Sequence, residues 1–448
     1  MSEIEWLATK IGRPDVERLN EREVALRILD TVGALVAGAG TEEGQMLLAM
    51  RRQEREAAGA FGQADVDLDL IVRCALARLS EVDDIHRASM MTPGAVVIPA
   101  VLTLAGESGA DVPTTMAAID AGYEAMIRLG RGVDGPAILA RGIWPTYLAT
   151  PFAVAAAAAR LWGLDPVQTA HALALAFCYA APAVGRPAGA ATSRWLAVGQ
   201  AVKNGLAAAN AARFGFVGDL SVLQDETLAN TRGLTFDAEA FRADPEVHLM
   251  SQVSFKPWCA AKQTMSASHA LRVLMPADPN DVADVTVRIP PVYAGMISHQ
   301  PAPANRSSHL TSLRHQMALA ALAPDAMCDV NQCAGGQSAR LDDFSQRIRV
   351  ETADDLQHYY PARYPADVSL VTRSGETRSA RMLSAPGDPE LPMSESQVVE
   401  KFERLVTDVV RRPCALLQAG QELLARPQSV ALLLGTVEMV LQQTDRCP

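Results

Sequence analysis

The sequence lacks several features that would assign a class of protein at once. Its seven cysteines are scattered and form no Cys-x-x-Cys pair, so neither a disulfide framework nor a zinc site is indicated. The N-terminus has no basic region followed by an apolar run, which argues against a signal peptide. The longest apolar stretch, 147–159, contains a proline and is too short to span a bilayer. We therefore expect a soluble, cytoplasmic protein.

An excess of positive charge is also missing. The net charge is −11, which argues against nucleic acid or an anionic membrane as a partner. A local basic pocket can still exist within an acidic protein, so a small anionic substrate remains compatible with this charge. Lysine is scarce, because only five of the 40 basic residues are lysines. Two of these five, Lys256 and Lys262, lie within seven residues of each other.

The length of 448 residues is too great for one ordinary core, so we expect two domains. Through the first 250 residues apolar side chains recur at helical spacing, alanine is frequent, and glycine and proline separate the segments. The pattern predicts helices over 20–39, 63–79, 95–106, 113–130, 147–162, 166–181 and 194–214. This part of the chain is therefore predicted to be all-helical.

The pattern changes after Lys256. Alternation of polar and apolar residues predicts strands, a turn follows at Gly375, and one helix is predicted over 307–322. The predicted strands are 284–290, 344–351 and 367–372. The final fifty residues are helical again, with Ser394 as a candidate N-cap and Gln397 three residues later. We expect a mainly α fold: a large all-helical domain (1–255 and 395–448) with a smaller inserted α+β domain (256–394).

One stretch, 80–99, gathers charged groups between two apolar segments. Five of them fall within seven residues: Glu81, Asp83, Asp84, His86 and Arg87. The stretch is either a solvated acidic loop or a site where charged groups are gathered to move protons. Thr92-Pro93-Gly94 predicts a helix start with Thr92 as N-cap. A helix N-terminus facing the acid cluster would also seat a substrate carboxylate.

Nine short motifs occur in order along the chain: Ile28-Leu-Asp-Thr-Val-Gly33, Glu81-Val-Asp-Asp-Ile-His86, Pro93-Gly-Ala-Val-Val-Ile-Pro99, Ala121-Gly-Tyr-Glu124, Arg128-Leu-Gly130, Ala157-Ala-Ala-Arg-Leu161, Lys256-Pro-Trp258, Ala385-Pro-Gly-Asp-Pro389 and Glu400-Lys-Phe402. Together they resemble the MmgE/PrpD family, which includes 2-methylcitrate dehydratase, cis-aconitate decarboxylase and iminodisuccinate epimerase. The resemblance implies a helical domain, a smaller α+β domain, a site between them, and a homodimer without metal or organic cofactor.

The departures from the family pattern concern its histidines. Thr92 stands where the dehydratases and decarboxylases usually carry His before Pro-Gly, and Trp144 replaces the His of a Gly-x-His-x-Thr segment. Met265 occupies the position of a third His, and Arg194 that of a common Lys. Acid and base roles of those histidines cannot be transferred to this chain. The dehydratase assignment loses much of its support.

The resemblance implies chemistry beside a carboxylate, which needs a base, cations and a dry pocket. The catalytic candidates are Asp83, Asp84, His86, Lys256 and Lys262. His86 is the best placed to titrate near neutral pH, although His86 and Asp84 could equally serve only to cap or tie helices. The two lysines could be a tunable base and a point charge, or two surface residues at a domain junction.

Seven further residues are candidates for binding the substrate: Thr92, Arg141, Trp144, Thr146, Arg186, Arg194 and His315. The arginines would clamp carboxylates, and His315 stands where the family often has Tyr. The acid stretch and the Lys256 segment are expected to converge on a single cleft at the seam of the two domains.

Three functions are compatible with these residues and with the resemblance. The first is proton abstraction next to a carboxylate of a small polycarboxylate-like substrate, as an epimerase or isomerase or as a C–O lyase. The second is dehydration or decarboxylation of the 2-methylcitrate or cis-aconitate type. The third is a family member without catalysis, kept as a binding or scaffold protein.

Overall fold

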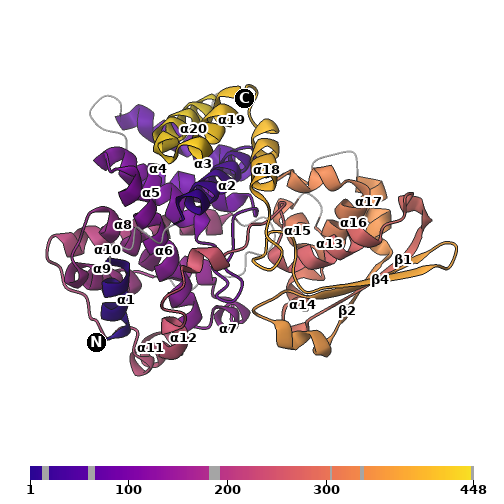
Figure 1. Ribbon diagram of the computed structural model, residues 1–448, viewed down its shortest axis with the longest axis horizontal. Coiled ribbons are helices and arrows are strands. Elements are labelled where there is room, and N and C mark those ends of the chain that lie inside the picture. The colour runs from indigo at the N-terminus through magenta and orange to yellow at the C-terminus, as the bar shows by residue number, and fades with distance from the viewer. Residues whose placement is uncertain (13–19, 59–65, 181–191, 303–304, 333–337, 445–448) are drawn as a thin grey trace. The chain divides into compact units, whose positions relative to one another are not determined.

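The computed structural model describes residues 1–12, 20–58, 66–180, 192–302, 305–332 and 338–444. The chain divides into two compact units (Figure 1). We call Met1–Val253 with Val398–Pro448 the helical unit, and Ser254–Gln397 the mixed unit. The fold is mainly α, with one small four-stranded sheet in the mixed unit among the described residues.

The helical unit carries every helix that was predicted for the first 250 residues, with ends that differ by a few residues. Its α-helices are α1 (Glu3–Gly12), α2 (Glu21–Ala39), α3 (Glu42–Ala58), α4 (Val66–Leu79), α5 (Gly94–Ser108), α6 (Val112–Gly132), α7 (Gly135–Ala140), α8 (Pro145–Leu161), α9 (Pro166–Cys178), α10 (Ser193–Arg213), α11 (Asp225–Arg232) and α12 (Ala238–Arg242). Three more close the chain: α18 (Glu395–Thr407), α19 (Cys414–Ala425) and α20 (Val430–Thr444).

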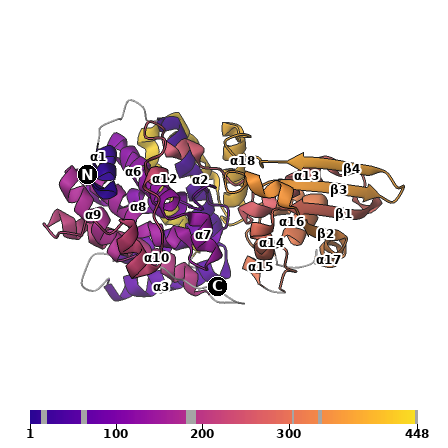
Figure 2. The same cartoon turned by 90° about the horizontal axis from the view of Figure 1, so that it is seen from below.

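Local chemistry explains where these helices begin and how closely they pack. Asp165 and Gln168 form a capping box at α9, in which each side chain accepts from the other residue's backbone N–H. The alanine-rich α8 is buried on nearly all sides and packs against α6 and α10 (Figures 1 and 2). A Cβ atom on Gly205 of α10 would lie 2.4 Å from the Pro151 carbonyl oxygen. Glycine is therefore required where α10 meets α8.

The mixed unit consists of a sheet in the order β2-β1-β3-β4 and helices that pack on it. Strand β1 pairs with β2 in parallel and with β3 in antiparallel fashion, and β3 pairs antiparallel with β4. Helix α13 packs on β3 and β4, and α16 packs on α13. The elements are α13 (Met265–Leu274), β1 (Val282–Ile289), α14 (Pro291–Ile297), α15 (Arg306–Thr311), α16 (Leu313–Leu322), α17 (Ser338–Gln346), β2 (Ile348–Thr352), β3 (Ala366–Thr372) and β4 (Thr377–Met382).

Two predictions for the mixed unit need correction. The expected strand 344–351 is wrong in its first half, because Phe344 is a buried residue of α17 and β2 begins at Ile348. The expected helix 307–322 is two helices, because Ser312 has extended backbone dihedrals between α15 and α16. The Ser312 hydroxyl instead caps α16 by accepting from the backbone N–H of His315. The turn at Gly375 is confirmed, with φ of 87°.

The last part of the chain follows its prediction. Ser394 and Gln397 exchange hydrogen bonds at the start of α18, as a capping box does. Among the described helices none is by itself long and apolar enough to cross a membrane, and α2 with α3 meets that test only as a pair bent by 89°.

Candidate functional site

The charged stretch between α4 and α5 is buried. We call residues 80–92 the acid loop, and its ionisable side chains expose only 1–6% of their surface: Glu81, Asp83, Asp84, His86 and Arg87. The alternative of a solvated acidic loop is therefore wrong. Buried charge is costly unless it is paired and hydrogen-bonded, so the partners of these groups define what the loop can do.

Asp83 is held against a fixed cation. The Nη1 atom of Arg78, at the end of α4, lies 3.0 Å from Asp83 Oδ1 and 3.2 Å from Glu81 Oε2. Burial acts to lower the pKa of Arg78, but the two carboxylates outweigh it and raise that pKa. Glu81 adopts a positive φ of 52°, which is unusual for this residue type and fixes its side chain next to Arg78.

Asp84 caps helix α5. Its Oδ1 accepts the Gly94 backbone N–H at 2.8 Å, its Oδ2 accepts the Tyr123 hydroxyl at 2.7 Å, and Arg27 Nη1 lies 3.7 Å away. Burial raises the pKa of Asp84 to about 6, although Arg27, Tyr123 and the Gly94 N–H all oppose that rise. The carboxylate of Asp84 thus occupies the helix N-terminus where a substrate carboxylate was expected.

Thr92 does not cap α5, so this prediction is wrong. No side-chain cap is present at that end other than Asp84 among the described residues. The backbone N–H and hydroxyl of Thr92 instead contact Thr146 Oγ1, at 3.2 Å and 3.0 Å. Thr146 lies in the first turn of α8, so this contact ties the end of the acid loop to the start of α8.

His86 is a buried, neutral imidazole. The Ser89 backbone N–H donates to His86 Nδ1 at 3.2 Å, and the Ser89 hydroxyl lies 2.7 Å from the same nitrogen, so the ring proton is assigned to Nε2. Burial, with help from Arg131 and Arg87, lowers the pKa of His86 to about 3, against a hydrogen bond with Gln252 that raises it. The prediction that His86 titrates near neutral pH is therefore wrong.

An aromatic group adjoins the acid loop at the start of α8. The rings of Trp144 and Tyr147 are stacked, with centroids 5.8 Å apart and an interplanar angle of 17°. The guanidinium of Arg194, in α10, lies 3.9 Å from the Trp195 ring and 5.6 Å from the Trp144 ring. Arg78 and Arg194 both act electrostatically on the Tyr147 hydroxyl. These contacts bring one set of side chains together, which we call the α8 cluster: Arg78, Asp83, Thr92, Trp144, Thr146, Tyr147 and Arg194.

One predicted arginine, Arg141, is not part of this cluster. Arg141 is exposed at the end of α7, and its Nη1 donates to the Gly233 carbonyl oxygen at 2.8 Å. Its guanidinium is thus engaged on the surface, unlike the buried Arg194. Arg186 lies outside the described residues.

In the mixed unit both predicted lysines are buried, each 2% exposed, so the alternative of two surface lysines is wrong. Lys262 Nζ lies 2.6 Å from Asp388 Oδ1. Asp388 also accepts from the Ser254 hydroxyl at 2.7 Å and from the Ala385 backbone N–H at 2.8 Å. Lys262 is therefore a member of a buried ion pair, which suits a positioning role better than that of a free base.

His315 is also buried, with 5% of its surface exposed. It lies in α16, and its ring meets that of His309 edge to face at a centroid distance of 4.7 Å. Burial, helped by His309, lowers the pKa of His315 to about 4. Its Nε2 atom has no hydrogen-bond partner among the described residues. His315 is thus a neutral imidazole with one ring nitrogen that has no partner among the described residues.

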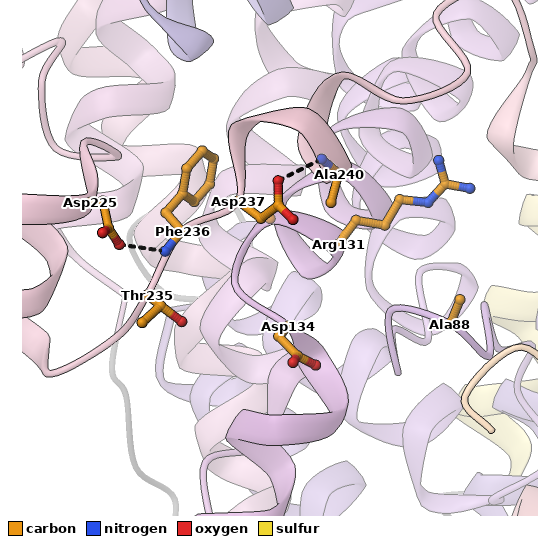
Figure 3. A pocket seen from close by; sticks show the side chains of 9 residues that line it. Ala88, Arg131, Asp134, Asp225, Thr235, Phe236, Asp237 and Ala240 are labelled. Atoms are coloured by element: carbon orange, nitrogen blue, oxygen red, sulfur yellow. Dashed lines mark hydrogen bonds between the residues drawn. The ribbon is translucent and has the colours of Figure 1, made fainter. Parts of the chain in front are cut away.

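An open cleft of about 540 Å³ lies beside the acid loop in the helical unit (Figure 3). Its wall combines three carboxylates with one cation and one aromatic ring: Asp134, Asp225, Asp237, Arg131 and Phe236. Figure 3 shows two of these carboxylates accepting backbone N–H groups, from Phe236 and Ala240. The Arg131 guanidinium is engaged by Gln252 at 2.6 Å and Asp244 at 3.2 Å. A cleft with this charge does not favour an anion such as the substrate that the sequence predicts.

Several residues that support the candidate site were missed by the sequence analysis. Lys401 Nζ binds Asp30 and donates to the Val82 carbonyl oxygen of the acid loop at 3.1 Å. Lys401 could have been identified from the sequence, because it is one of only five lysines and lies in the motif Glu400-Lys-Phe402. Arg27 and Arg78 gave no signal, since each reads as an ordinary residue of an amphipathic helix. No group of three His, Cys, Asp or Glu side chains that could hold a metal occurs in the described part of the chain.

Known proteins supply the family of this chain. No curated protein matches the chain significantly. The profile of the MmgE/PrpD N-terminal domain matches residues 4–234, and that of the MmgE/PrpD C-terminal domain matches residues 258–419. These two matches cover most of the chain, including the acid loop, the α8 cluster and Lys262, and the second begins two residues after Lys256. The chain therefore belongs to the MmgE/PrpD family.

Proposed function

We propose that this protein is a cofactor-independent enzyme that abstracts a proton next to a carboxylate of a small polycarboxylate-like substrate. Membership of a family whose members are generally lyases or dehydratases supports an enzyme of this broad kind. The observation that carries the proposal is the α8 cluster, where two buried guanidinium groups, two threonine hydroxyls and two aromatic rings meet. In a dry environment, guanidinium and hydroxyl groups stabilise negative charge that develops on a substrate oxygen.

The base in this proposal is Lys256 of the mixed unit. Proton abstraction from carbon needs an amine that is shielded from water, and Lys256 is 2% exposed. Lys262 is less suited because Asp388 neutralises it at 2.6 Å. Arg194 would bind a substrate carboxylate, and His86, which is neutral at physiological pH, would hold the shape of the acid loop.

Epimerisation or isomerisation is favoured over hydroxide elimination. Removal of hydroxide needs an acid near the leaving oxygen, and the family positions that would hold imidazoles carry Thr92, Trp144 and the fully buried Met265. Dehydration or decarboxylation is the second candidate, because lyase chemistry is general in the family. We also propose that the enzyme is cytoplasmic and forms a homodimer. Light scattering of the purified protein would test the homodimer.

The test is to incubate the protein with a panel of di- and tricarboxylates in deuterated water. Carbanion formation predicts deuterium at the carbon next to a carboxylate. Product of unchanged mass, apart from deuterium, would identify an epimerase or isomerase, whereas loss of water or carbon dioxide would identify a lyase. Absence of both exchange and turnover with every compound would contradict the proposal and favour a binding protein.

A matched pair of lysine variants assigns the base. Lys256→Ala is expected to lower the exchange rate by several orders of magnitude, on the order of the contribution of a nucleophile or base to catalysis, while the fold is kept. Lys203→Ala is the control, since Lys203 pairs with Asp67 on the surface of α10. Wild-type turnover in Lys256→Ala would remove Lys256 from the mechanism.

A further inference from the structure

Tyr147 differs from other buried tyrosines of this protein in the state of its hydroxyl. The ring is 2% exposed, and its hydroxyl has no hydrogen-bond partner among the residues that the structure describes. By contrast, the Tyr123 hydroxyl donates to Asp84 Oδ2 at 2.7 Å, and the Tyr293 hydroxyl donates to the Pro365 carbonyl oxygen at 3.0 Å. A buried hydroxyl without a partner destabilises a fold, and phenylalanine would fill the same space without that cost. The hydroxyl of Tyr147 therefore calls for a role outside the packing of the core.

The surroundings of Tyr147 indicate which ligand its hydroxyl suits. Arg78 and Arg194 act on it as cations, and Glu81 and Asp83, which both contact Arg78, act on it as anions. Burial raises the pKa of Tyr147 despite the two guanidinium groups, so the phenol keeps its proton at neutral pH and can donate it in a hydrogen bond. A carboxylate oxygen placed at this hydroxyl would meet a hydrogen-bond donor. Two guanidinium groups would attract it, against the two carboxylates that are paired with Arg78.

The backbone around Tyr147 holds this hydroxyl in a fixed place. Tyr147 lies in the first turn of α8, directly after Thr146, whose hydroxyl is bound to Thr92 of the acid loop. Its ring is stacked on Trp144, the residue that stands in place of a family histidine. A phenol that is stacked on one side and anchored in a helix loses little entropy when a ligand binds.

We propose that the Tyr147 hydroxyl is a substrate-binding group, which donates a hydrogen bond to a carboxylate oxygen of a di- or tricarboxylate held by the α8 cluster. This inference rests on the proposed function, since it places the anionic substrate at the same cluster. It adds a binding residue that the sequence analysis did not name. The substrate group recognised at this cluster is a carboxylate, next to Arg194 and the stacked rings of Trp144 and Tyr147.

The first experiment measures binding in the full chain by calorimetry, with citrate and tricarballylate as probes and sulfate at equal ionic strength as the control anion. Tyr147→Phe is expected to weaken the binding of both tricarboxylates about 10- to 100-fold, the effect of one hydrogen bond to a charged group. Tyr293→Phe is the matched control and should bind as the wild type does. Unchanged affinity in Tyr147→Phe, or no binding of any di- or tricarboxylate by the wild type, would overturn the inference.

The second experiment separates a binding role from a structural one. Without ligand, Tyr147→Phe should melt about 2–4 °C higher than the wild type, because a buried hydroxyl without a partner is removed. Tyr293→Phe should melt lower, because it loses a hydrogen bond. A lower melting temperature for Tyr147→Phe would show that its hydroxyl serves the fold and would contradict the inference.

The inference and the proposed function fail in different ways. Citrate binding should change the near-ultraviolet absorbance of tyrosine in the wild type and leave that of Tyr147→Phe unchanged. If the wild type exchanges deuterium and Tyr147→Phe does so with the same KM, the inference is wrong and the function stands. If the wild type binds citrate through Tyr147 but exchanges no deuterium with any carboxylate, the inference stands and the enzyme function is wrong.

Discussion

The carboxyl of Asp84 gives a sharp test of how the acid loop is held. Its pKa is raised to about 6, mainly by burial, from an ordinary value of 3.8. A carboxyl with a higher pKa in the folded chain binds its proton more tightly there than in the unfolded chain. Protonation of Asp84 therefore stabilises the fold. This contribution is complete below about pH 4 and is lost as the pH rises through about 6.

Asp84→Asn removes this titration and keeps an oxygen that can accept the Gly94 N–H. Each pKa unit corresponds to about 1.4 kcal/mol, and the pKa is raised by about two units. The difference in free energy of unfolding, wild type minus variant, should therefore fall by about 3 kcal/mol as the pH rises from below the pKa of the unfolded chain to above that of the folded chain. About 2 kcal/mol of that fall should appear between roughly pH 4.5 and 7.5.

The sign of this change decides between two opposing effects. Arg27 Nη1 lies 3.7 Å from Asp84 Oδ2 and favours the charged carboxylate, whereas burial favours the neutral carboxyl. If the ion pair were dominant, the pKa would be depressed and the difference between wild type and variant would rise with pH. A rising or flat difference would therefore refute the claim that burial dominates at Asp84.

The assay is urea denaturation followed by tryptophan fluorescence at each pH. Trp258 is the tryptophan of the mixed unit, so both proteins should carry Trp258→Phe. The remaining four tryptophans then report on the helical unit alone: Trp6, Trp144, Trp162 and Trp195. Subtraction of the two stability curves cancels the titration of all other groups that the substitution leaves unchanged.

Three further predictions concern the support of the acid loop. Gly94→Ala should destabilise the protein by about 1–3 kcal/mol, since its Cβ would lie 2.7 Å from the carboxylate oxygen that caps α5. Gly106 lies in the same helix with open space around it, so Gly106→Ala should stabilise the protein by about 1 kcal/mol. Equal effects of the two substitutions in chemical denaturation would contradict this prediction. Lys401→Met should cost about 3–5 kcal/mol because it leaves Asp30 buried and unpaired, and a loss below about 1 kcal/mol would show that the pair is dispensable. His86→Gln should leave the shape of the pH–rate profile between about pH 5 and 8 unchanged, since the imidazole is neutral throughout, whereas an inflection lost in the variant would refute its low pKa.

The helices of this protein could be predicted because their signals are local. Apolar spacing alone gave α2, α6, α8 and α10 to within a few residues of their observed ends. The capping box at Ser394 and Gln397 was readable because its two partners are three residues apart. The strand at 367–372 was also predicted, because its side chains alternate between buried and half-buried positions along β3.

The acid loop could not be interpreted in the same way, because its partners come from distant parts of the sequence. Asp84 displaced Thr92 as the cap of α5, and it is held there by Tyr123 from another helix. Its burial depends on α2 and α18, through Arg27 and Lys401. A sequence shows that such charges are close together along the chain, but it does not show whether distant cations will neutralise them.

These contacts bear on where the proton-abstracting base can be. The acid loop supplies three candidates, Asp83, Asp84 and His86, and the last two are poorly suited to that task. The imidazole of His86, with a pKa of about 3, is too weak a base to compete for a proton on carbon. Asp84 is buried, and its two oxygens already accept the Gly94 N–H and the Tyr123 hydroxyl, so its carboxylate serves as the cap of α5.

The acid loop is therefore better understood as a rigid support for the α8 cluster than as the source of the base. Thr92, at its end, binds Thr146, and Asp83 fixes the guanidinium of Arg78 near Tyr147. In the proposed mechanism Lys256 abstracts the proton, and the residues of the helical unit bind the substrate and stabilise its charge. A substitution such as Asp83→Asn should raise KM and lower kcat together, because it loosens the guanidinium, without shifting the pH at which the rate rises. A shift of that pH would identify Asp83 as the titrating base and contradict the assignment of Lys256.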